Sequence, residues 1–266
     1  MIDLKKSSRD ILSELSIEAK RLVRAGYYNV DFDRKRAVRS LRSSILSRDN
    51  KAIIAEIKRA SPSSGWLRKD LDIKSIIASI ERGGAAGISI LTMPRYFHGD
   101  LKFLSEASTI TKLPLLMKDF IVSSNQIEAG WRSGADAILL ILKIFKKRYS
   151  ELSIEEAIRK IHSLGMEVLL EVHTREELLE ASALDVDLIG VNSRNLETMY
   201  VETDNFIHSI ANIDVNNRVL VAESGINSPE QISMLKKLGY KAFLIGTAIM
   251  KSNDVEQAVK SFVGDP

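Results

Sequence analysis

A short apolar run followed by a helical pattern recurs eight times and is the feature that most constrains this fold. The apolar runs cover residues 53–58, 88–92, 113–118, 137–142, 167–172, 188–192, 218–223 and 242–247. The helical patterns lie near residues 73–82, 101–110, 124–133, 151–164, 174–183, 203–212, 228–238 and 254–262. Nearly continuous apolar strands are typical of a parallel sheet covered by helices on both faces. Eight such units predict an α/β fold, a closed (β/α)8 TIM barrel.

The turns between these units support the same architecture. Glycines at 83, 134, 165 and 239 follow predicted helices, where a left-handed residue is expected before the chain returns to a strand. The competing architecture is an open, doubly wound sheet. Its nucleotide-binding versions lack their signature here, because no Gly-x-Gly-x-x-Gly follows the first strand and no Walker loop is present.

The segment before the barrel follows a different pattern. Apolar spacing predicts one helix over residues 8–25 and a second around residues 38–45, with a break near Gly26. Residues 1–51 hold 13 lysines and arginines against 7 aspartates and glutamates, whereas the whole chain has a net charge of only +3. We therefore expect one barrel domain over residues 1–266, of which residues 1–51 are an N-terminal helical extension.

Composition limits the cofactors and the compartment. The absence of cysteine removes disulfides, thiolate metal sites and cysteine nucleophiles, and is compatible with a reducing cytoplasm. The 4 histidines show no recurring spacing with carboxylates, so no metal is expected. No apolar run reaches the roughly 20 residues that cross a bilayer, and charges interrupt residues 1–22, unlike a signal peptide. We expect a cytoplasmic protein with no membrane partner.

The basic extension leaves RNA binding open as a side activity. Solvated amphipathic helices explain the same charge, and no aromatic RNA-binding motif or zinc-finger spacing is present. Nucleic acid is therefore not the expected partner. Affinity that was absent at low salt, or did not fall with added salt, would exclude it. The oligomeric state stays open, with a monomer as one option.

Charged residues collect at the ends of the odd-numbered strands. The first ends in Glu56 and Lys58, the third in Lys118, the fifth in Glu171 and the seventh in Glu223. Active sites of (β/α)8 barrels lie at the carboxyl ends of the strands, and alternate strands contribute to one layer. One such pair is more often structural, but a packed core does not tolerate this density of charge unless it opens to a polar ligand. The repetition predicts an active site.

Other strand ends add groups that suit a phosphate ester. Asn192 and Arg194 share a face and could hold hydroxyls and a carboxylate. The last two strands end in Ser224-Gly225 and Gly246-Thr247, and loops at these positions commonly bind phosphate in this fold. Lys58 could supply a charge to the same phosphate.

Two loops and the histidines are less certain guides. Pro62 and the Ser-Ser-Gly that follows open a loop whose amides could approach an anion. Glu223 and Ser224 cannot both face inward along a regular strand, so the sequence leaves undetermined which of the two faces the site. Among the histidines only His173 shares the parity of a site candidate.

Several segments, in the same order along the chain, resemble the motifs of the indole-3-glycerol phosphate synthase family. They are residues 54–63 (IAEIKRASPS), 116–120 (LMKDF), 190–196 (GVNSRNL), 222–226 (AESGI) and 243–247 (FLIGT). The resemblance runs from about residue 30 to the end of the chain. It implies a carboxy-lyase of tryptophan biosynthesis that converts the phosphosugar 1-(o-carboxyphenylamino)-1-deoxyribulose 5-phosphate to indole-3-glycerol phosphate, carbon dioxide and water, without a cofactor.

The resemblance also implies catalytic roles at matching positions. Lys118 would be the general acid that protonates the ketone, and Glu171 would assist proton transfer in the dehydration. Glu56 and Lys58 would hold and polarise the substrate or its leaving hydroxyl, and Asn192 would position the ring carboxylate or an intermediate. How Glu56, Lys58 and Glu171 divide the dehydration stays open.

Binding positions follow from the same resemblance. Those implied at the substrate or its phosphate are Ser61, Arg194, Glu223, Ser224, Gly225, Gly246, Thr247, Phe97, Phe120 and Leu139. The two phenylalanines and the leucine would wall the anthranilate ring, and Thr247 stands where a serine is common. The N-terminal extension would be a basic lid that keeps water from the iminium formed on ring closure.

Two other functions remain as alternatives. Phosphoribosylanthranilate isomerase shares the fold, but its cysteine base is impossible in this chain. A catalytically silent phosphate-binding scaffold is expected to lose the charges at strands three and five, and both are present.

Overall fold

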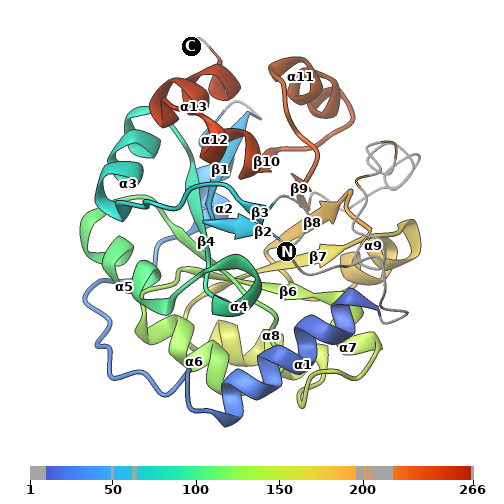
Figure 1. Cartoon of the computed structure of the whole chain (residues 1–266). Coiled ribbons are helices and arrows are strands. Elements are labelled where there is room, and N and C mark those ends of the chain that lie inside the picture. Colours follow the sequence, from blue (N-terminus) through green and yellow to red (C-terminus); the bar gives the residue numbers. More distant parts are fainter. Residues whose placement is uncertain are drawn as a thin grey trace.

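Eight parallel strands close into a barrel, which confirms the predicted fold (Figure 1). The computed structural model describes residues 10–48, 51–61, 65–195, 201, 204 and 218–264. The barrel strands are β1 (Ala52–Ile57), β4 (Gly87–Leu91), β5 (Leu115–Lys118), β6 (Ala137–Ile141), β7 (Glu167–Val172), β8 (Leu188–Asn192), β9 (Val219–Glu223) and β10 (Ala242–Ile245). Each strand pairs with its neighbours in sequence, and β1 pairs with both β4 and β10 to close the sheet.

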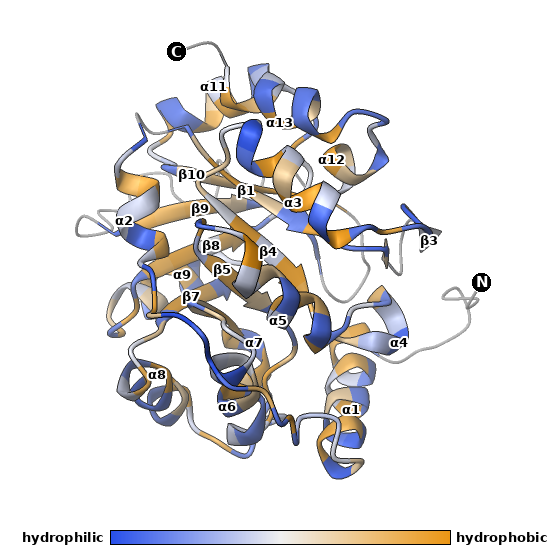
Figure 2. Ribbon diagram, turned by 90° about the vertical axis from the view of Figure 1, so that its left-hand side faces the viewer, coloured by the Kyte–Doolittle hydropathy of each residue, from blue (hydrophilic) through white to orange (hydrophobic). Residues whose placement is uncertain are grey.

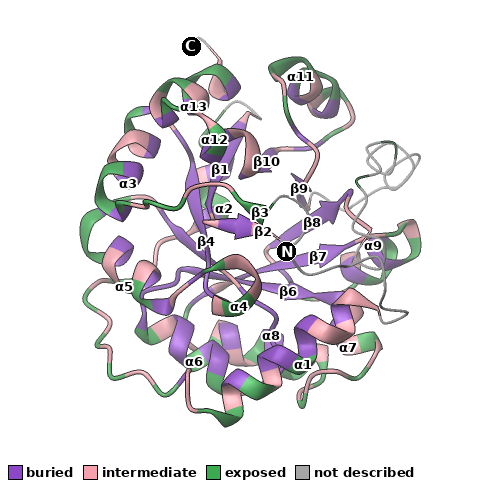
Figure 3. Cartoon of the chain, viewed as in Figure 1, coloured by how far each residue is buried: buried purple, intermediate pink, exposed green. Residues whose placement is uncertain are grey.

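Helices surround this barrel. The helices that follow the strands are α3 (Ile73–Arg82), α5 (Leu101–Ile110), α6 (Ser124–Arg132), α8 (Ile154–Ser163), α9 (Arg175–Ser182), α11 (Pro229–Lys237) and α13 (Val255–Val263). The helix predicted over residues 203–212 lies outside the described residues. The strands are buried, and the helices expose their outer faces (Figure 3).

Short elements missed by the sequence patterns lie in the loops between strands and helices. They are α4 (Pro94–Phe97), α7 (Leu142–Lys146), α12 (Thr247–Lys251) and the antiparallel pair β2 (Ala60–Ser61) and β3 (Gly65–Trp66). Residues 62–64, where the sequence suggested an anion-binding loop, are outside the described part of the chain. Elements of two to five residues are too short to show a hydrophobic period.

Two predicted details need correction. The third strand begins at Leu115 and not at residue 113, because Pro114 has no N–H to donate to a neighbouring strand. Gly83 has a φ of −69° and is not left-handed, whereas Gly84 has a φ of +85°. Gly83 is needed for space instead, since a Cβ there would lie 2.6 Å from Val259 Cβ.

The N-terminal extension places its two helices at opposite ends of the barrel (Figure 2). Helix α1 (Ile11–Arg24) follows the N-cap Asp10, whose side chain accepts a hydrogen bond from Leu12 N, and it buries Leu12, Leu15, Ala19 and Leu22. Helix α2 (Leu41–Leu46) covers the amino ends of the strands, where its Leu41 packs against Gly87 of β4. No described helix is both long and apolar enough to cross a membrane.

Three of the four basic residues between these helices are held against the barrel, and the fourth, Lys35, is exposed. Arg34 pairs with Asp136 at 2.9 Å and donates to the carbonyl oxygens of Trp131 and Ala135. Arg36 also pairs with Asp136, and Arg39 donates its backbone N–H to the same carboxylate. Arg34 and Arg36 therefore form a largely buried ion-pair cluster with Asp136 and are not part of a solvated face.

Candidate active site

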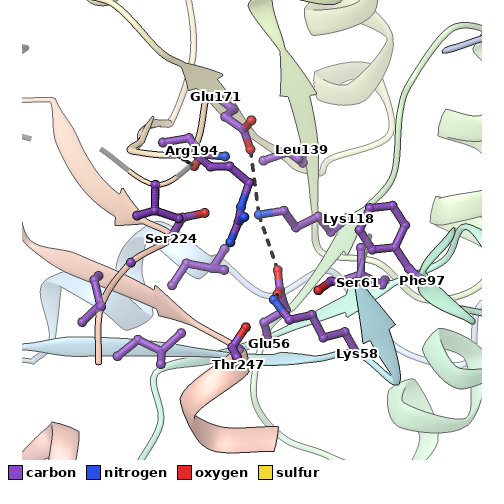
Figure 4. A pocket seen from close by; sticks show the side chains of 18 of the residues that line it. Glu56, Lys58, Ser61, Phe97, Lys118, Leu139, Glu171, Arg194, Ser224 and Thr247 are labelled. Carbon is purple, nitrogen blue, oxygen red and sulfur yellow. Dashed lines mark hydrogen bonds and ion pairs between the residues drawn. The ribbon is translucent and has the colours of Figure 1, made fainter. Parts of the chain in front are cut away.

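Lys118, at the end of β5, stands at the centre of a layer of carboxylates (Figure 4). Its Nζ lies 2.7 Å from Glu223 Oε2, 3.5 Å from Glu56 Oε2 and 3.8 Å from Glu171 Oε2. These carboxylates come from β9, β1 and β7, so alternate strands contribute to one layer. Lys58 joins the layer through a 2.6 Å contact with Glu56 Oε1.

The end of β9 shows how the adjacent residues Glu223 and Ser224 can both lie near the site. Glu223 is the last residue of the strand and faces inward, where it meets Lys118. Ser224 follows with a φ of +67°, and Gly225 has a φ of +73°. This left-handed turn breaks the alternation, so Ser224 also lines the pocket. Glu223 does not line the pocket but lies beneath it, completely buried.

Two glycines provide the space for this layer. A Cβ at Gly190 of β8 would overlap Glu223 Oε1. A Cβ at Gly246 would overlap Glu56 Oε1 and would lie 3.0 Å from Lys58 Nζ. Any larger residue at these positions would displace the carboxylates from the lysines.

The carboxylates keep Lys118 charged. Burial alone would lower the pKa of Lys118, but Glu223, Glu56 and Glu171 together raise it above its usual value. Burial and the other two carboxylates raise the pKa of Glu223. The pKa of Glu56 is lowered, because Lys58 and Lys118 outweigh its burial. The layer thus holds a protonated amine beside carboxyl groups of different acidity.

Glu171 has a second partner outside the pocket. Its Oε1 lies 3.2 Å from His173 Nε2, and its side chain also hydrogen-bonds to Asn192. These contacts and Lys118 lower the pKa of Glu171 against the opposing effect of burial. The neighbouring carboxylates raise the pKa of His173 to about 9, although burial opposes the shift.

His98 and His162 have partners outside this layer. His98 stacks on Trp66 with ring centroids 4.0 Å apart, and His162 pairs with Asp187 at 2.9 Å. His208 lies outside the described residues.

A pocket lies above the charged layer and collects the predicted residues. Its lining includes Glu56, Lys58, Ser61, Phe97, Lys118, Phe120, Leu139, Glu171, Asn192, Arg194, Ser224, Gly225, Gly246 and Thr247. The phenyl rings of Phe97 and Phe120 stack at 5.9 Å on one side, and Figure 4 shows Ser224 across the pocket from Phe97. The pocket therefore has an apolar wall that suits a ring and an opposite wall of hydroxyl and backbone groups.

Sequence reasoning missed part of this lining. Leu15 of α1 reaches the pocket, and Asn227 and Gln231 contribute from the turn and helix after β9. Leu15 carries the helical period of α1, but no local pattern indicates which part of the barrel that helix covers. Gln231 forms a capping box with Ser228, a signal that explains the start of α11 and not its proximity to the pocket.

The fold and this site define a barrel enzyme that carries out acid–base chemistry on a small polar ligand. The sequence profile of the indole-3-glycerol phosphate synthase family matches residues 10–262. The chain belongs to this family, as its motifs predicted. It is 38% identical over 262 residues to the indole-3-glycerol phosphate synthase of Sulfurimonas denitrificans, covering 97% of this chain and 95% of that relative. It is 43% identical over 212 residues to that of Sulfurisphaera tokodaii, covering 79% of this chain and 83% of the relative.

Solved structures support the fold. The 3-hexulose-6-phosphate synthase of Salmonella typhimurium superposes with a TM-score of 0.62 at 12% identity, over 80% of this chain and 96% of that one. The thiamine phosphate pyrophosphorylase of Pyrococcus furiosus gives a TM-score of 0.57 at 17% identity, over 84% of this chain and 96% of that one. At these identities the likeness concerns the barrel alone.

Proposed function

We propose that Lys118 is the general acid of the ring closure. The chain is an indole-3-glycerol phosphate synthase, a carboxy-lyase that closes and decarboxylates 1-(o-carboxyphenylamino)-1-deoxyribulose 5-phosphate in tryptophan biosynthesis. The ketone oxygen gains negative charge as the arene attacks the carbonyl carbon, so a proton donor is needed there, and a lysine ammonium can serve. The observation that carries this role is the position of Lys118 Nζ in the pocket, within 4 Å of three carboxylates.

The remaining charged groups suit the later steps. Glu171, with its lowered pKa, would accept the proton that leaves the ring as the indole forms. Glu56 and Lys58 form one ion pair, which would hold the leaving hydroxyl and protonate it as water departs. Asn192, hydrogen-bonded to Glu171, would position the ring carboxylate.

The two walls of the pocket suit the two ends of the substrate. The anthranilate ring would lie against Phe97, Phe120 and Leu139. The phosphate would bind near Ser61, Arg194, Ser224, Gly225, Gly246 and Thr247, all of which line the pocket. Glu223 would act from below by holding Lys118 in place.

Adding the substrate and following indole fluorescence tests this function. We expect the indole fluorescence to rise. The indole product and carbon dioxide should form in equal amounts. A folded protein that gave no signal would contradict the function and favour the isomerase alternative. That alternative has little support, because the chain lacks cysteine.

We also propose that residues 1–266 form one domain and act in the cytoplasm as a monomer. The buried side chains of α1 and α2 join the same core as the barrel, which supports a single domain. Leu15 supports a role for α1 in covering the pocket. Ultracentrifugation would test the monomer, and a dimer would contradict it.

A further inference from the structure

The reaction consumes one proton in each turnover. The side chain of the charged layer that donates this proton must be reprotonated before the next cycle. The substrate carboxylate leaves as neutral carbon dioxide, and the electron pair of the broken C–C bond neutralises the iminium. Lys118 gives a proton to the ketone oxygen during ring closure. That oxygen later leaves as water, and its second proton is matched by the proton that the substrate loses in the dehydration. The acid and base of the dehydration balance each other. Lys118 therefore ends the cycle one proton short.

A chain of buried groups leads away from Lys118. Lys118 Nζ lies 3.8 Å from Glu171 Oε2, and Glu171 Oε1 lies 3.2 Å from His173 Nε2. On the other side of the imidazole, His173 Nδ1 lies 3.7 Å from Glu177 Oε2. Glu177 belongs to α9 in the outer layer of helices (Figure 1). The positive charge of Lys143, in α7, helps to lower the pKa of Glu177. The groups alternate between bases and acids from the pocket to the helix layer.

We propose that Glu177, His173 and Glu171 relay a proton from the outer helix layer to Lys118 and so recharge it after each turnover. His173 passes a proton from Nε2 to Glu171, Glu171 passes it to the neutral amine of Lys118, and His173 regains one at Nδ1 through Glu177. One proton moves inward in each cycle, and Glu177, whose side chain keeps 8% of its surface exposed, takes it from solvent water. The relay would work while substrate or product still blocks the pocket.

The environment of His173 suits this task. Its side chain keeps 8% of its surface exposed, and those of Glu171 and Glu177 keep 2% and 8%, so the path is shielded from bulk water. The backbone N–H of His173 donates to Glu177 Oε2 at 2.8 Å, which holds this carboxylate near His173. Its raised pKa keeps the imidazole protonated at neutral pH. His173 does not line the pocket, so it is a positioning residue that acts through Glu171.

The test compares His173→Gln with His162→Gln, a matched change at a histidine that also pairs with a carboxylate, that of Asp187, but lies outside the pocket lining. We expect His173→Gln to lower kcat about 10-fold, leave KM within about twofold and increase the solvent deuterium isotope effect on kcat. Imidazole added to His173→Ala should restore part of kcat. The His162→Gln variant should match the wild type.

A second variant protects the test against misfolding. Glu177→Gln keeps an acceptor for the His173 N–H but removes the outer carboxylate, and it should also lower kcat without raising KM. Unchanged kcat and isotope effect in His173→Gln or Glu177→Gln, or no rescue by imidazole, would overturn the relay. The relay rests on the proposed function, and the outcomes differ. A wild type without product defeats the function, whereas equal activity of wild type and His173→Gln defeats only the relay.

Discussion

The two ends of the barrel each bury a cluster of charges, but the clusters differ in what their central cation faces. At the amino end, Arg34 donates to the carbonyl oxygens of Arg36, Trp131 and Ala135 and to Asp136, so four of its five N–H donors are used within the protein. At the carboxyl end, Lys118 meets its carboxylates and still lines a pocket. A buried charge is therefore not by itself a sign of catalysis. The sign is a buried charge that remains available to a ligand.

The largest difference between the two ends is expected when the central charge at the carboxyl end is removed. Lys118→Met should lower turnover by about 10³-fold or more, because it removes the proposed proton donor to the ketone oxygen. The barrel should still fold, since the freed carboxylates can take up protons. Indole fluorescence measures the loss and circular dichroism measures the fold. Near wild-type turnover would show that Lys118 is not the acid.

The opposite result is expected at the amino end. Asp136→Ala leaves three arginines without their shared carboxylate and should lower the free energy of unfolding by about 3–5 kcal/mol. Turnover per folded molecule should stay within about twofold of wild type. Urea titrations measure the stability, and Asp33→Ala is the control, because its pair with Lys35 spans 3.9 Å on the exposed surface. A large loss of turnover in folded Asp136→Ala would mean that the two ends are coupled.

Raising the pH should reduce the stability contributed by His173 at the carboxyl end. The pKa of His173 is raised to about 9 in the folded protein, above the usual 6.5 of an unfolded chain. Its contribution to stability is therefore complete below pH 6.5 and is lost as the pH rises through 9, by on the order of 2 kcal/mol. His173→Gln should lack this loss between pH 6.5 and 9. Parallel curves for the two proteins, from urea titrations at each pH, would contradict the shift.

The smallest effect is expected from a single methyl group. Gly246→Ala would push its Cβ against Glu56 and Lys58, and we expect kcat/KM to fall about 10-fold with the fold intact. Gly87→Ala is the matched control at the amino end, where a Cβ would lie 2.6 Å from Leu41 Cδ1. It should reduce stability and leave kcat/KM unchanged. Equal kinetic losses in both variants would contradict the division between the ends.

The two clusters also differ in how far the sequence predicts them. The carboxyl end was predictable because Lys118, Glu171 and Glu56 end odd-numbered strands, and strand parity and barrel closure bring them together. The amino end was not, because Arg34 and Asp136 are 102 residues apart and no local pattern pairs them. The position of Glu223 beneath the pocket likewise depends on the left-handed turn at Ser224. Contacts set by the path of the chain need the folded structure.

The central claim is that Lys118 acts as an acid and not only as a charge. The most direct test is the rate of ring closure in a single turnover by Lys118→Arg, because a guanidinium keeps the positive charge but does not release its proton. We predict that this variant folds and binds substrate but closes the ring about 10³-fold more slowly than wild type. Ring closure at a rate near that of wild type would show that a fixed positive charge is enough, and would contradict the role of Lys118 as the general acid.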